Sequence, residues 1–474
     1  MAEYFGIIKG KGEDMDIFSR RDFIGGAVSL TATFAKGEAV SVPSTVVAGV
    51  SGDFVEPSRK LQVETCDVLV AGGGPAGIAT AAAAARAGAK VVLLELHGAL
   101  GGVWTNGFMG CMMDFNQSAT DRELTRRLDL LSARCPRTPM KPMRYAANYV
   151  YEPEYMKLVC EDFCAEAGVD FRLHTAVVAA YRDASGRNIE TVVTESKDGR
   201  RAWRAKVFVD CTGDGDLAAF AGCGFDFGGL EGGNDQPGSL CSVAVSPHPE
   251  QIAPFVVNHP STFDEQGRQA VFPKTAFLRE LKRAGIDPSY HYPTLFMARP
   301  GIYVFIVNHS YGLPVDDVKA ITAATVRARK ETLEAARALE RLGGAWEGFR
   351  VVATAEQIGH RAARRIHGLY TLTAEDAVSG AKFPDAVTTA HIGIDIHATT
   401  LEQNRKKAIS SNGYRSKPFQ VPLRACIAKD VGNLFMAGRC ISGDFIPMGS
   451  YRVTGSAVAM GEAVGKAAAG RAKQ

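Results

Sequence analysis

The chain has 474 residues, of which 46% are hydrophobic and 22% charged, and its net charge at pH 7 is +3. This length suffices for two or three domains with a large core, and the composition is ordinary for a soluble globular protein. The small net charge and the lack of a Lys/Arg run argue against a nucleic-acid partner, and no apolar stretch is long enough to predict a membrane span. The ten cysteines include no Cys-x-x-Cys pair, so no metal site is expected.

Residues 1–36 resemble a twin-arginine export signal. Arg20 and Arg21 precede a charge-free apolar stretch that is too short to span a bilayer. The twin-arginine export machinery carries folded proteins, so we expect an exported, periplasmic protein. A cytoplasmic location follows instead if the two arginines are a chance pair. Met15 is an alternative start, and residues 37–64 are expected to form a linker.

The segment 66–96 predicts one complete strand–turn–helix–strand unit. An apolar strand leads into the pattern Gly72-x-Gly74-x-x-Gly77, then an Ala-rich helix and a second strand that ends at Glu95. Gly72 permits a tight turn, Gly74 lets a pyrophosphate approach the backbone, and Gly77 lets helix and strand pack closely. The helix N-terminus offers N–H groups and a positive dipole end to phosphates, and Glu95 can bind a ribose hydroxyl. The unit therefore predicts a Rossmann-like dinucleotide site. Its helix start also contributes Pro75 and Ala76.

The following part of the chain predicts more strands and helices of the same domain. We expect helices around 123–135 and 154–167, a strand at 169–173, and a hairpin at 189–195 and 201–209. The last of these strands runs into the sequence Asp-Cys-Thr-Gly-Asp-Gly-Asp at 210–216.

Two acids in that sequence, Asp214 and Asp216, could be taken for metal ligands. A short helix is expected directly after them, at 217–221. Acids at a helix start cap and charge its N-terminus, and this is the simpler interpretation.

A Gly- and Pro-rich stretch after residue 228 marks a crossing between domains. Residues 241–420 mix strands with a long amphipathic helix at 314–342, and we interpret them as an inserted α+β substrate domain. Residues 65–240 and 421–474 then form the α/β cofactor domain. Its closing segment is a glycine turn and an Ala-rich helix, whose N-terminus again presents N–H groups to an anion.

A basic cluster in the inserted domain supplies the first candidate catalytic residues, His360 and Arg361. His360 and Arg364 are four apart, as are Arg361 and Arg365, so a helix would place each pair on one face. Two cationic faces suit a carboxylate, an enolate or a developing alkoxide. A solvated basic helix explains the pattern equally well.

A second candidate pair is Asp395 and His397. On a strand these side chains point to the same side. An acid beside a histidine is a common way to orient and tune a general base. A purely structural pair remains the alternative.

The motifs together resemble the bacterial family of FAD-dependent oxidoreductases, which has a glutathione-reductase-like FAD fold. The resemblance rests on the Gly-Gly loop at 101–107, the Asp-Cys-Thr-Gly turn at 210–213, the segment 359–376 and the strand and turn at 433–439. It extends from about residue 61 to 469 and implies non-covalently bound FAD. The FAD contacts that it implies, besides those of the glycine turn, are Leu96, Gly101, Gly102, Trp104, Thr105, Val177, Gly213, Asp214, Gly438, Arg439, Arg452 and Val453. Arg439 replaces an acid that is usual there, and Trp104 is explained equally well as a core aromatic.

The resemblance also implies an activity. A hydride would pass between flavin N5 and a small organic substrate, such as a sugar or a hydroxy, keto or unsaturated acid. His360 or His397 would move the proton, and Arg361 would hold a charged oxygen. The sequence has no second GxGxxG for NAD(P)H and no GxSxG elbow, so the electron donor or acceptor stays open. The alternatives are a flavin-containing lyase or isomerase without net redox change and an electron-transfer flavoprotein subunit.

Overall fold

The computed structural model describes residues 56–134, 148–230, 233–264 and 270–474. The chain divides into two units, residues 1–59 and residues 60–474, and the described helices and strands all belong to the second. The predicted export signal at 1–36 lies outside the described residues. Residues 37–55 of the predicted linker also lie outside the described residues. The last two residues of that linker, 63 and 64, already belong to the first strand.

The first sheet is largely parallel and has the strand order β5-β2-β1-β8-β7-β6, with β19 pairing β8. β1, β2, β5, β8 and β19 run parallel, whereas β6, β7 and β8 are joined antiparallel. The last four residues of β1, Val68–Ala71, are buried completely, as expected for a parallel strand covered on both faces. The strands are β1 Val63–Ala71, β2 Val91–Leu94, β5 Asp170–Arg172, β6 Ala176–Arg182, β7 Ile189–Ser196, β8 Gly199–Asp210 and β19 Leu434–Met436.

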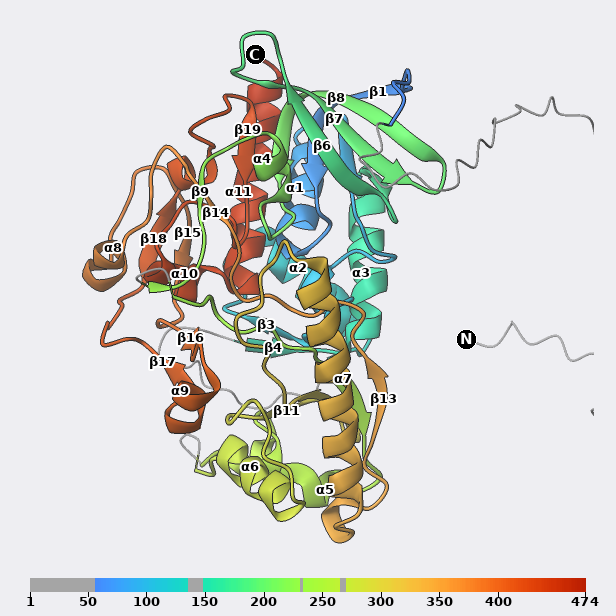
Figure 1. Ribbon diagram of the computed structural model, residues 1–474, viewed down its shortest axis with the longest axis vertical. Coiled ribbons are helices and arrows are strands. Elements are labelled where there is room, and N and C mark those ends of the chain that lie inside the picture. Colours follow the sequence, from blue (N-terminus) through green and yellow to red (C-terminus); the bar gives the residue numbers. More distant parts are fainter. Residues whose placement is uncertain (1–55, 135–147, 231–232, 265–269) are drawn as a thin grey trace, which may run out of the picture. The chain divides into compact units, whose positions relative to one another are not determined.

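Two helices from opposite ends of the unit pack against each other beside this sheet. α1 (Pro75–Arg86) and α11 (Thr454–Ala472) lie side by side in Figure 1. A Cβ added at Gly461 would lie 2.3 Å from the backbone oxygen of Ala76, so the two backbones approach as closely as glycine allows. The closing segment of the chain is thereby fixed beside the glycine turn that precedes α1.

A second, antiparallel sheet has the order β11-β12-β10-β13. Its strands are β10 Ser242–Val245, β11 Thr294–Arg299, β12 Ile302–Ile306 and β13 Arg350–Thr354. It has its own hydrophobic core, centred on aromatic side chains such as Phe277, Phe305 and Trp346. In Figure 1, α5 (Pro249–Ile252), α6 (Pro273–Arg283) and α7 (Val318–Glu340) lie around this sheet.

Shorter elements complete the unit. Four two-stranded sheets pair β3 with β4, β9 with β14, β15 with β18 and β16 with β17. These strands are β3 Cys111–Met113, β4 Asn148–Val150, β9 Phe225–Asp226, β14 Arg365–Ile366, β15 Ala386–Ala390, β16 Ile396–His397, β17 Ile409–Ser410 and β18 Phe419–Pro422. The other helices are α2 Ala119–Leu130, α3 Pro153–Glu166, α4 Asp216–Phe220, α8 Ala374–Ser379, α9 Leu401–Lys406 and α10 Phe445–Tyr451.

Two predicted helices differ from the structure for reasons of capping. α2 begins four residues before the predicted 123 because Ser118 and Asp121 form a capping box. α7 begins at Val318, later than the predicted 314, because the side chain of Asp317 accepts hydrogen bonds from the N–H groups of Lys319 and Ala320. Among the described residues, no helix is long and apolar enough to cross a membrane.

The separate hydrophobic core of the inserted domain covers a shorter range than the predicted 241–420. The second core draws its buried residues from 244–349. Residues such as Ile366, Leu372 and Ile396 instead pack in the first core together with β1 and α11. Only the first part of the predicted insertion therefore has a core of its own, and the chain has rejoined the first core well before residue 421.

Candidate functional site

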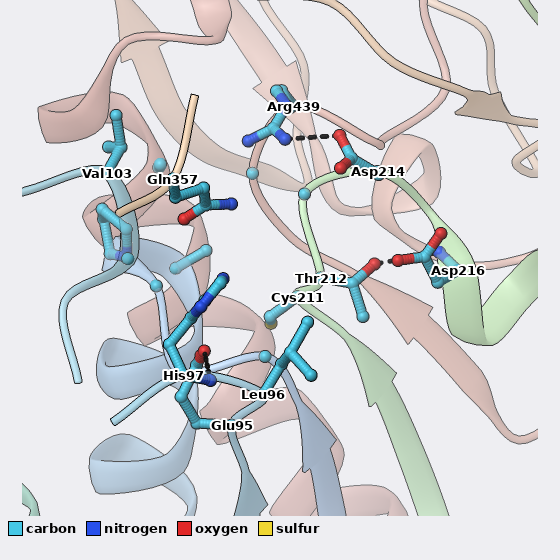
Figure 2. A pocket seen from close by; sticks show the side chains of 18 of the residues that line it. Glu95, Leu96, His97, Val103, Cys211, Thr212, Asp214, Asp216, Gln357 and Arg439 are labelled. Atoms are coloured by element: carbon cyan, nitrogen blue, oxygen red, sulfur yellow. Dashed lines mark hydrogen bonds and ion pairs between the residues drawn. The ribbon is translucent and has the colours of Figure 1, made fainter. Parts of the chain in front are cut away.

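A cavity opens where four neighbouring strands of the first sheet end. Ala71 of β1 is paired with Leu94 of β2 and with Asp210 of β8, and Asp210 is also paired with Met436 of β19. The residues that follow these strands all line the cavity. Ligands of parallel α/β sheets bind at this carboxyl edge. Figure 2 shows the cavity with the Asp214–Arg439 pair on one side and Val103 and Gln357 on the other.

Many of the predicted cofactor residues lie together on this cavity. Those that line it are Gly72, Gly74, Pro75, Ala76, Glu95, Leu96, Gly102, Val177, Gly213, Asp214, Gly438, Arg439 and Arg452.

The three glycines of the turn have three different surroundings. Gly72 has φ +96°, and a Cβ there would lie 2.4 Å from the backbone oxygen of Cys211. A Cβ on Gly77 would lie 1.8 Å from the oxygen of Gly72, so this glycine is required for the contact between α1 and β1. A Cβ on Gly74 would meet nothing within 4 Å. Gly74 therefore leaves open space beside the N-terminus of α1, where a phosphate can approach the backbone.

Glu95 is buried at one end of the cavity. One carboxylate oxygen accepts a hydrogen bond of 2.6 Å from the N–H of Gly73, and the other accepts one of 2.8 Å from the N–H of His97. An ionised carboxylate has about four acceptor positions, so each oxygen can still accept from a ribose hydroxyl. Leu96 and Val177 line the same end.

An ion pair forms the middle of the cavity wall. The guanidinium of Arg439 donates to the carboxylate of Asp214 at 2.5 Å. Gly213 has φ +78°, and a Cβ there would lie 2.4 Å from this guanidinium, so the glycine makes room for it. The Nε of Arg439 is buried and has no partner among the described residues. The acid that the resemblance leads one to expect at position 439 is therefore replaced by Asp214, whose carboxylate Arg439 binds in this part of the cavity wall.

The helix-capping roles predicted for Asp214 and Asp216 are only partly correct. Gly215 is the N-cap of α4, and Asp216 lies in its first turn. Asp214 pairs with Arg439 instead, and Asp216 pairs with Arg364 at 2.8 Å. Burial, together with the nearby charges of Asp214 and Asp210, raises the pKa of Asp216 to about 6.

The far end of the cavity lies at the start of α11. Arg452 and Thr454 line it, and the Nε of Arg452 and the hydroxyl of Thr454 are buried without partners among the described residues. Gln357 and His360 line the same cavity. Unpaired donors beside the N-terminus of a long helix favour a ligand that is rich in acceptors.

Five predicted cofactor residues do not line the cavity but support its wall. Gly77 packs α1 on β1, and Gly101 donates its N–H to the oxygen of Gly73 at 2.8 Å. The hydroxyl of Thr105 donates to the oxygen of Leu100 at 2.7 Å. Val453 is buried in a small apolar cluster. Trp104, expected beside a flavin ring, is fully buried against the ring of Tyr151, which is the alternative that the sequence had left open.

The predicted helical arrangement of the basic cluster is wrong. Residues 359–364 form no helix, because the backbone of Gly359 pairs with that of Ser239. Arg361 donates to the oxygen of Pro237 at 2.7 Å and to the hydroxyl of Ser239 at 2.9 Å. Arg364 reaches Asp216, and Arg365 reaches the oxygen of Gly228. The arginines therefore point to separate partners and form no shared cationic face.

The predicted Asp395–His397 pair does form, next to the cavity. His397 Nε2 lies 3.8 Å from a carboxylate oxygen of Asp395. Arg452, which lines the cavity, donates to the backbone oxygen of Asp395 at 3.0 Å and to its carboxylate at 3.3 Å. The pair is thus one residue removed from the cavity wall.

A second histidine, His309, fixes the tautomer of His397. His309 Nδ1 lies 3.0 Å from the backbone oxygen of Asn308, which can only accept, so Nδ1 carries the proton. In neutral His309 the Nε2 then accepts, and its partner 3.0 Å away, His397 Nδ1, must donate. This leaves the lone pair of neutral His397 on Nε2, the atom beside Asp395.

Burial keeps both imidazoles neutral. Desolvation lowers the pKa of His397 well below its usual range, and the charges of Arg361, Arg452 and Lys274 lower it further. Desolvation and Arg361 lower the pKa of His309 in the same way. We call the following six residues the junction cluster: Lys274, His309, Arg361, Asp395, His397 and Arg452.

Sequence reasoning missed several residues of this site. His309 lies three residues after the buried strand β12, so a polar residue close behind an apolar run was a usable signal. Lys274 lies in the first turn of α6, and Gln236 and Gln357 lie in loops, where no local pattern distinguishes them. His97 directly follows the Glu95–Leu96 dipeptide and lines the same cavity.

Within the described residues, no cluster of His, Cys, Asp and Glu is arranged to hold a metal ion.

Comparison with known proteins gives one family. The family model described as FAD dependent oxidoreductase matches residues 67–474. A comparison with curated proteins finds no match.

Solved structures with a similar arrangement include a geranylgeranyl bacteriochlorophyll reductase-like protein from Thermoplasma acidophilum. It is 13% identical with a TM-score of 0.44, and the match covers 87% of this chain and 79% of that one. A p-nitrophenol 4-monooxygenase from Pseudomonas putida is 17% identical with a TM-score of 0.36, over 65% of this chain and 70% of that one. Values this low carry no argument about activity.

Proposed function

Because the chain belongs to the family of FAD-dependent oxidoreductases, we propose that it transfers a hydride between a small organic substrate and FAD bound in the cavity. The observation that carries this proposal is that the cavity and the junction cluster share one residue, Arg452. Arg452 lines the cavity and also holds Asp395, the partner of His397. In this proposal the Rossmann-like α/β core would hold FAD at one side of Arg452, and the junction cluster would supply acid–base groups at the other.

The residues of the cavity fit FAD. Glu95, Leu96 and Val177 would hold the adenosine end, and the N-terminus of α1 with Gly74 would hold the pyrophosphate. Three buried polar groups lack partners among the described residues: the Nε of Arg439, the Nε of Arg452 and the hydroxyl of Thr454. This is expected if a bound ligand supplies their hydrogen-bond partners. We propose that the glutathione-reductase-like form of FAD binding applies. When bound, FAD supplies N5 as the atom that accepts or donates the hydride.

The proton that accompanies the hydride would be moved by His397. Its Nε2 carries the lone pair, because His309 and the backbone oxygen of Asn308 fix the tautomer. Asp395, 3.8 Å from that nitrogen, would stabilise the imidazolium that forms. Arg361 would hold the charged oxygen of the substrate. His360 is the second candidate for the proton transfer, since it lines the cavity and burial lowers its pKa.

Anaerobic substrate screening tests the function directly. The purified protein, loaded with FAD, is mixed with small hydroxy acids, keto acids, unsaturated acids and sugars while the visible flavin absorbance is followed; the oxidised compounds are tested against flavin that has been reduced chemically. Bleaching or reoxidation by one small molecule supports the proposal. Product without net redox change would point to a lyase or isomerase, and reduction only by a partner protein would point to an electron-transfer subunit.

We further propose that the protein is exported by the twin-arginine route, on the strength of Arg20 and Arg21 before the apolar stretch. Replacing both arginines by lysine should leave unprocessed, FAD-loaded protein in the cytoplasm. If the double variant still reaches the periplasm, the export proposal is wrong, and the enzymatic one is unaffected.

A further inference from the structure

Two buried hydrogen-bond donors, one in the junction cluster and one on the neighbouring Gln236, have no acceptor among the described residues. Among the described residues, the partners of Arg361 are both neutral: it donates to the oxygen of Pro237 and to the hydroxyl of Ser239. The Nε of Arg452 is buried without a partner among the described residues. The same holds for the amide Nε2 of Gln236, whose side chain is 4% exposed. The other end of Gln236 is fixed, because its Oε1 accepts from the N–H of His397 at 3.0 Å.

The fixed charges of the cluster do not balance either. Lys274, Arg361 and Arg452 carry positive charge, against the carboxylate of Asp395 within the cluster and that of Asp235 beside Arg452. Lys274 makes no ion pair with a described residue, and its ammonium lies over the ring of Tyr292 at 4.4 Å from the ring centre. Burial lowers the pKa of Lys274 to about 8 and that of Arg452 to about 10. An excess of positive charge on partly buried side chains is costly, and a ligand that supplies negative charge would offset it.

We propose that Lys274, Arg361, Arg452 and Gln236 form a subsite for a carboxylate group of the substrate, beside the end of the cavity that Arg452 lines. This inference rests on the proposed function and narrows its substrate to an organic acid. A carboxylate offers the acceptor atoms that the unpaired donors lack, and its planar shape suits a guanidinium. A sugar without an acidic group would leave the excess of positive charge in this cluster uncompensated.

The subsite would also couple binding to acid–base chemistry. Arg361, Arg452 and Lys274 each lower the pKa of His397. A carboxylate bound among them offsets their charge, so the imidazole becomes a stronger base once an acid is in place. The base would then be activated by the substrate that needs it.

Direct binding to the FAD-loaded protein tests the subsite. Acetate, propionate and succinate are titrated against the flavin absorbance spectrum and by calorimetry, with acetamide, propionamide and succinamide as neutral analogues. At least one acid should bind at least ten-fold more tightly than its amide. Lys274→Met should weaken that binding by about 10- to 100-fold, as for loss of a hydrogen bond to a charged group. Lys274→Arg should restore most of it.

Lys282→Met is the matched control, because Lys282 lies on the same helix α6 but is exposed. It should leave acid binding unchanged. In the wild type, binding should weaken as the pH rises through about 8, where Lys274 loses its proton; the groups that act on it are Asp395, Cys111, Arg361 and the ring of Tyr292. Lys274→Met should lack this step.

The outcomes separate this inference from the function on which it rests. The subsite is wrong if no acid binds better than its amide, or if Lys274→Met binds the acids as the wild type does. If only neutral compounds bleach the flavin, the subsite falls and the redox function stands. If acids bind as expected while no compound exchanges electrons with the flavin, the subsite stands and the redox function falls.

Discussion

The cofactor cavity and the junction cluster touch at Arg452 but are built in opposite ways. The cavity depends on backbone: glycine turns, strand ends and the N-termini of α1 and α11. Its wall carries more acids than fixed cations, with Glu95, Asp214 and Asp216 against Arg439 and Arg452. The junction cluster depends on side chains from separate segments, and its cations outnumber its single carboxylate. The first arrangement suits a cofactor recognised by its phosphates and hydroxyls, and the second suits an acidic substrate.

The sharpest test of the cavity uses two glycines three residues apart. Gly74→Val should fold but lose FAD completely, because the added side chain enters open space that the pyrophosphate needs, and φ −70° is allowed for any residue. Gly77→Val should fail to fold, since even its Cβ would lie 1.8 Å from the oxygen of Gly72. Circular dichroism and FAD content of the purified variants distinguish the two effects. A yellow, FAD-loaded Gly74→Val protein would overturn the placement of the phosphates.

The largest expected effect in the junction cluster is that of His397. His397→Ala should slow flavin reduction by about 10²–10⁴-fold while FAD content stays full, the usual contribution of a positioned general base. His309→Gln should produce a smaller loss, because it disturbs the tautomer and not the base itself. His360→Ala serves as the comparison, since this residue lines the cavity at a different point. If the large loss in the rate of flavin reduction occurs in His360→Ala instead, His360 and not His397 is the base.

The contrast between the two regions explains how far the sequence could be interpreted. The glycine turn, Glu95 and the strands around them form one continuous pattern, so the fold and most of the cavity could be predicted. The junction cluster could be predicted only in part. Asp395 and His397 were recognised as a pair, but Lys274 and His309 come together with His397 only through tertiary packing. The basic cluster misled the prediction, since a spacing of four suggests a helix whereas the backbone of Gly359 is paired with Ser239. Trp104 shows the same limit, because only packing decides whether an aromatic ring is in the core or on a ligand.

A smaller effect should follow from breaking the ion pair in the cavity wall. Asp214→Asn leaves the guanidinium of Arg439 without its counter-charge and without the contact that fixes its direction. We expect FAD affinity to fall about 10- to 100-fold, within the range for loss of a hydrogen bond to a charged group. The dissociation constant of FAD can be measured by fluorescence on reconstituted apoprotein. Asp216→Asn is the matched control, because the partner of Asp216 is Arg364 and not Arg439. Equal affinities for wild type and Asp214→Asn would show that the pair is not needed for binding.

The smallest effect concerns stability in mild acid, and it depends on the two buried histidines of the junction cluster. Folding lowers the pKa values of His309 and His397 well below 6.5, so below that pH the unfolded chain binds protons that the folded protein does not. Their contribution to stability is complete above about pH 6.5 and is lost as the pH falls towards the folded pKa values. Each histidine should then lower the free energy of unfolding by roughly 1.4 kcal/mol per pH unit. Urea unfolding of the FAD-loaded protein between pH 7 and 5 measures this slope, and His309→Gln, which removes one of the two imidazoles, should reduce it. An unchanged slope in that variant would mean that His309 binds its proton in the folded state as it does in the unfolded chain, and the assignment of the His397 tautomer, which requires a neutral His309, would have to be abandoned.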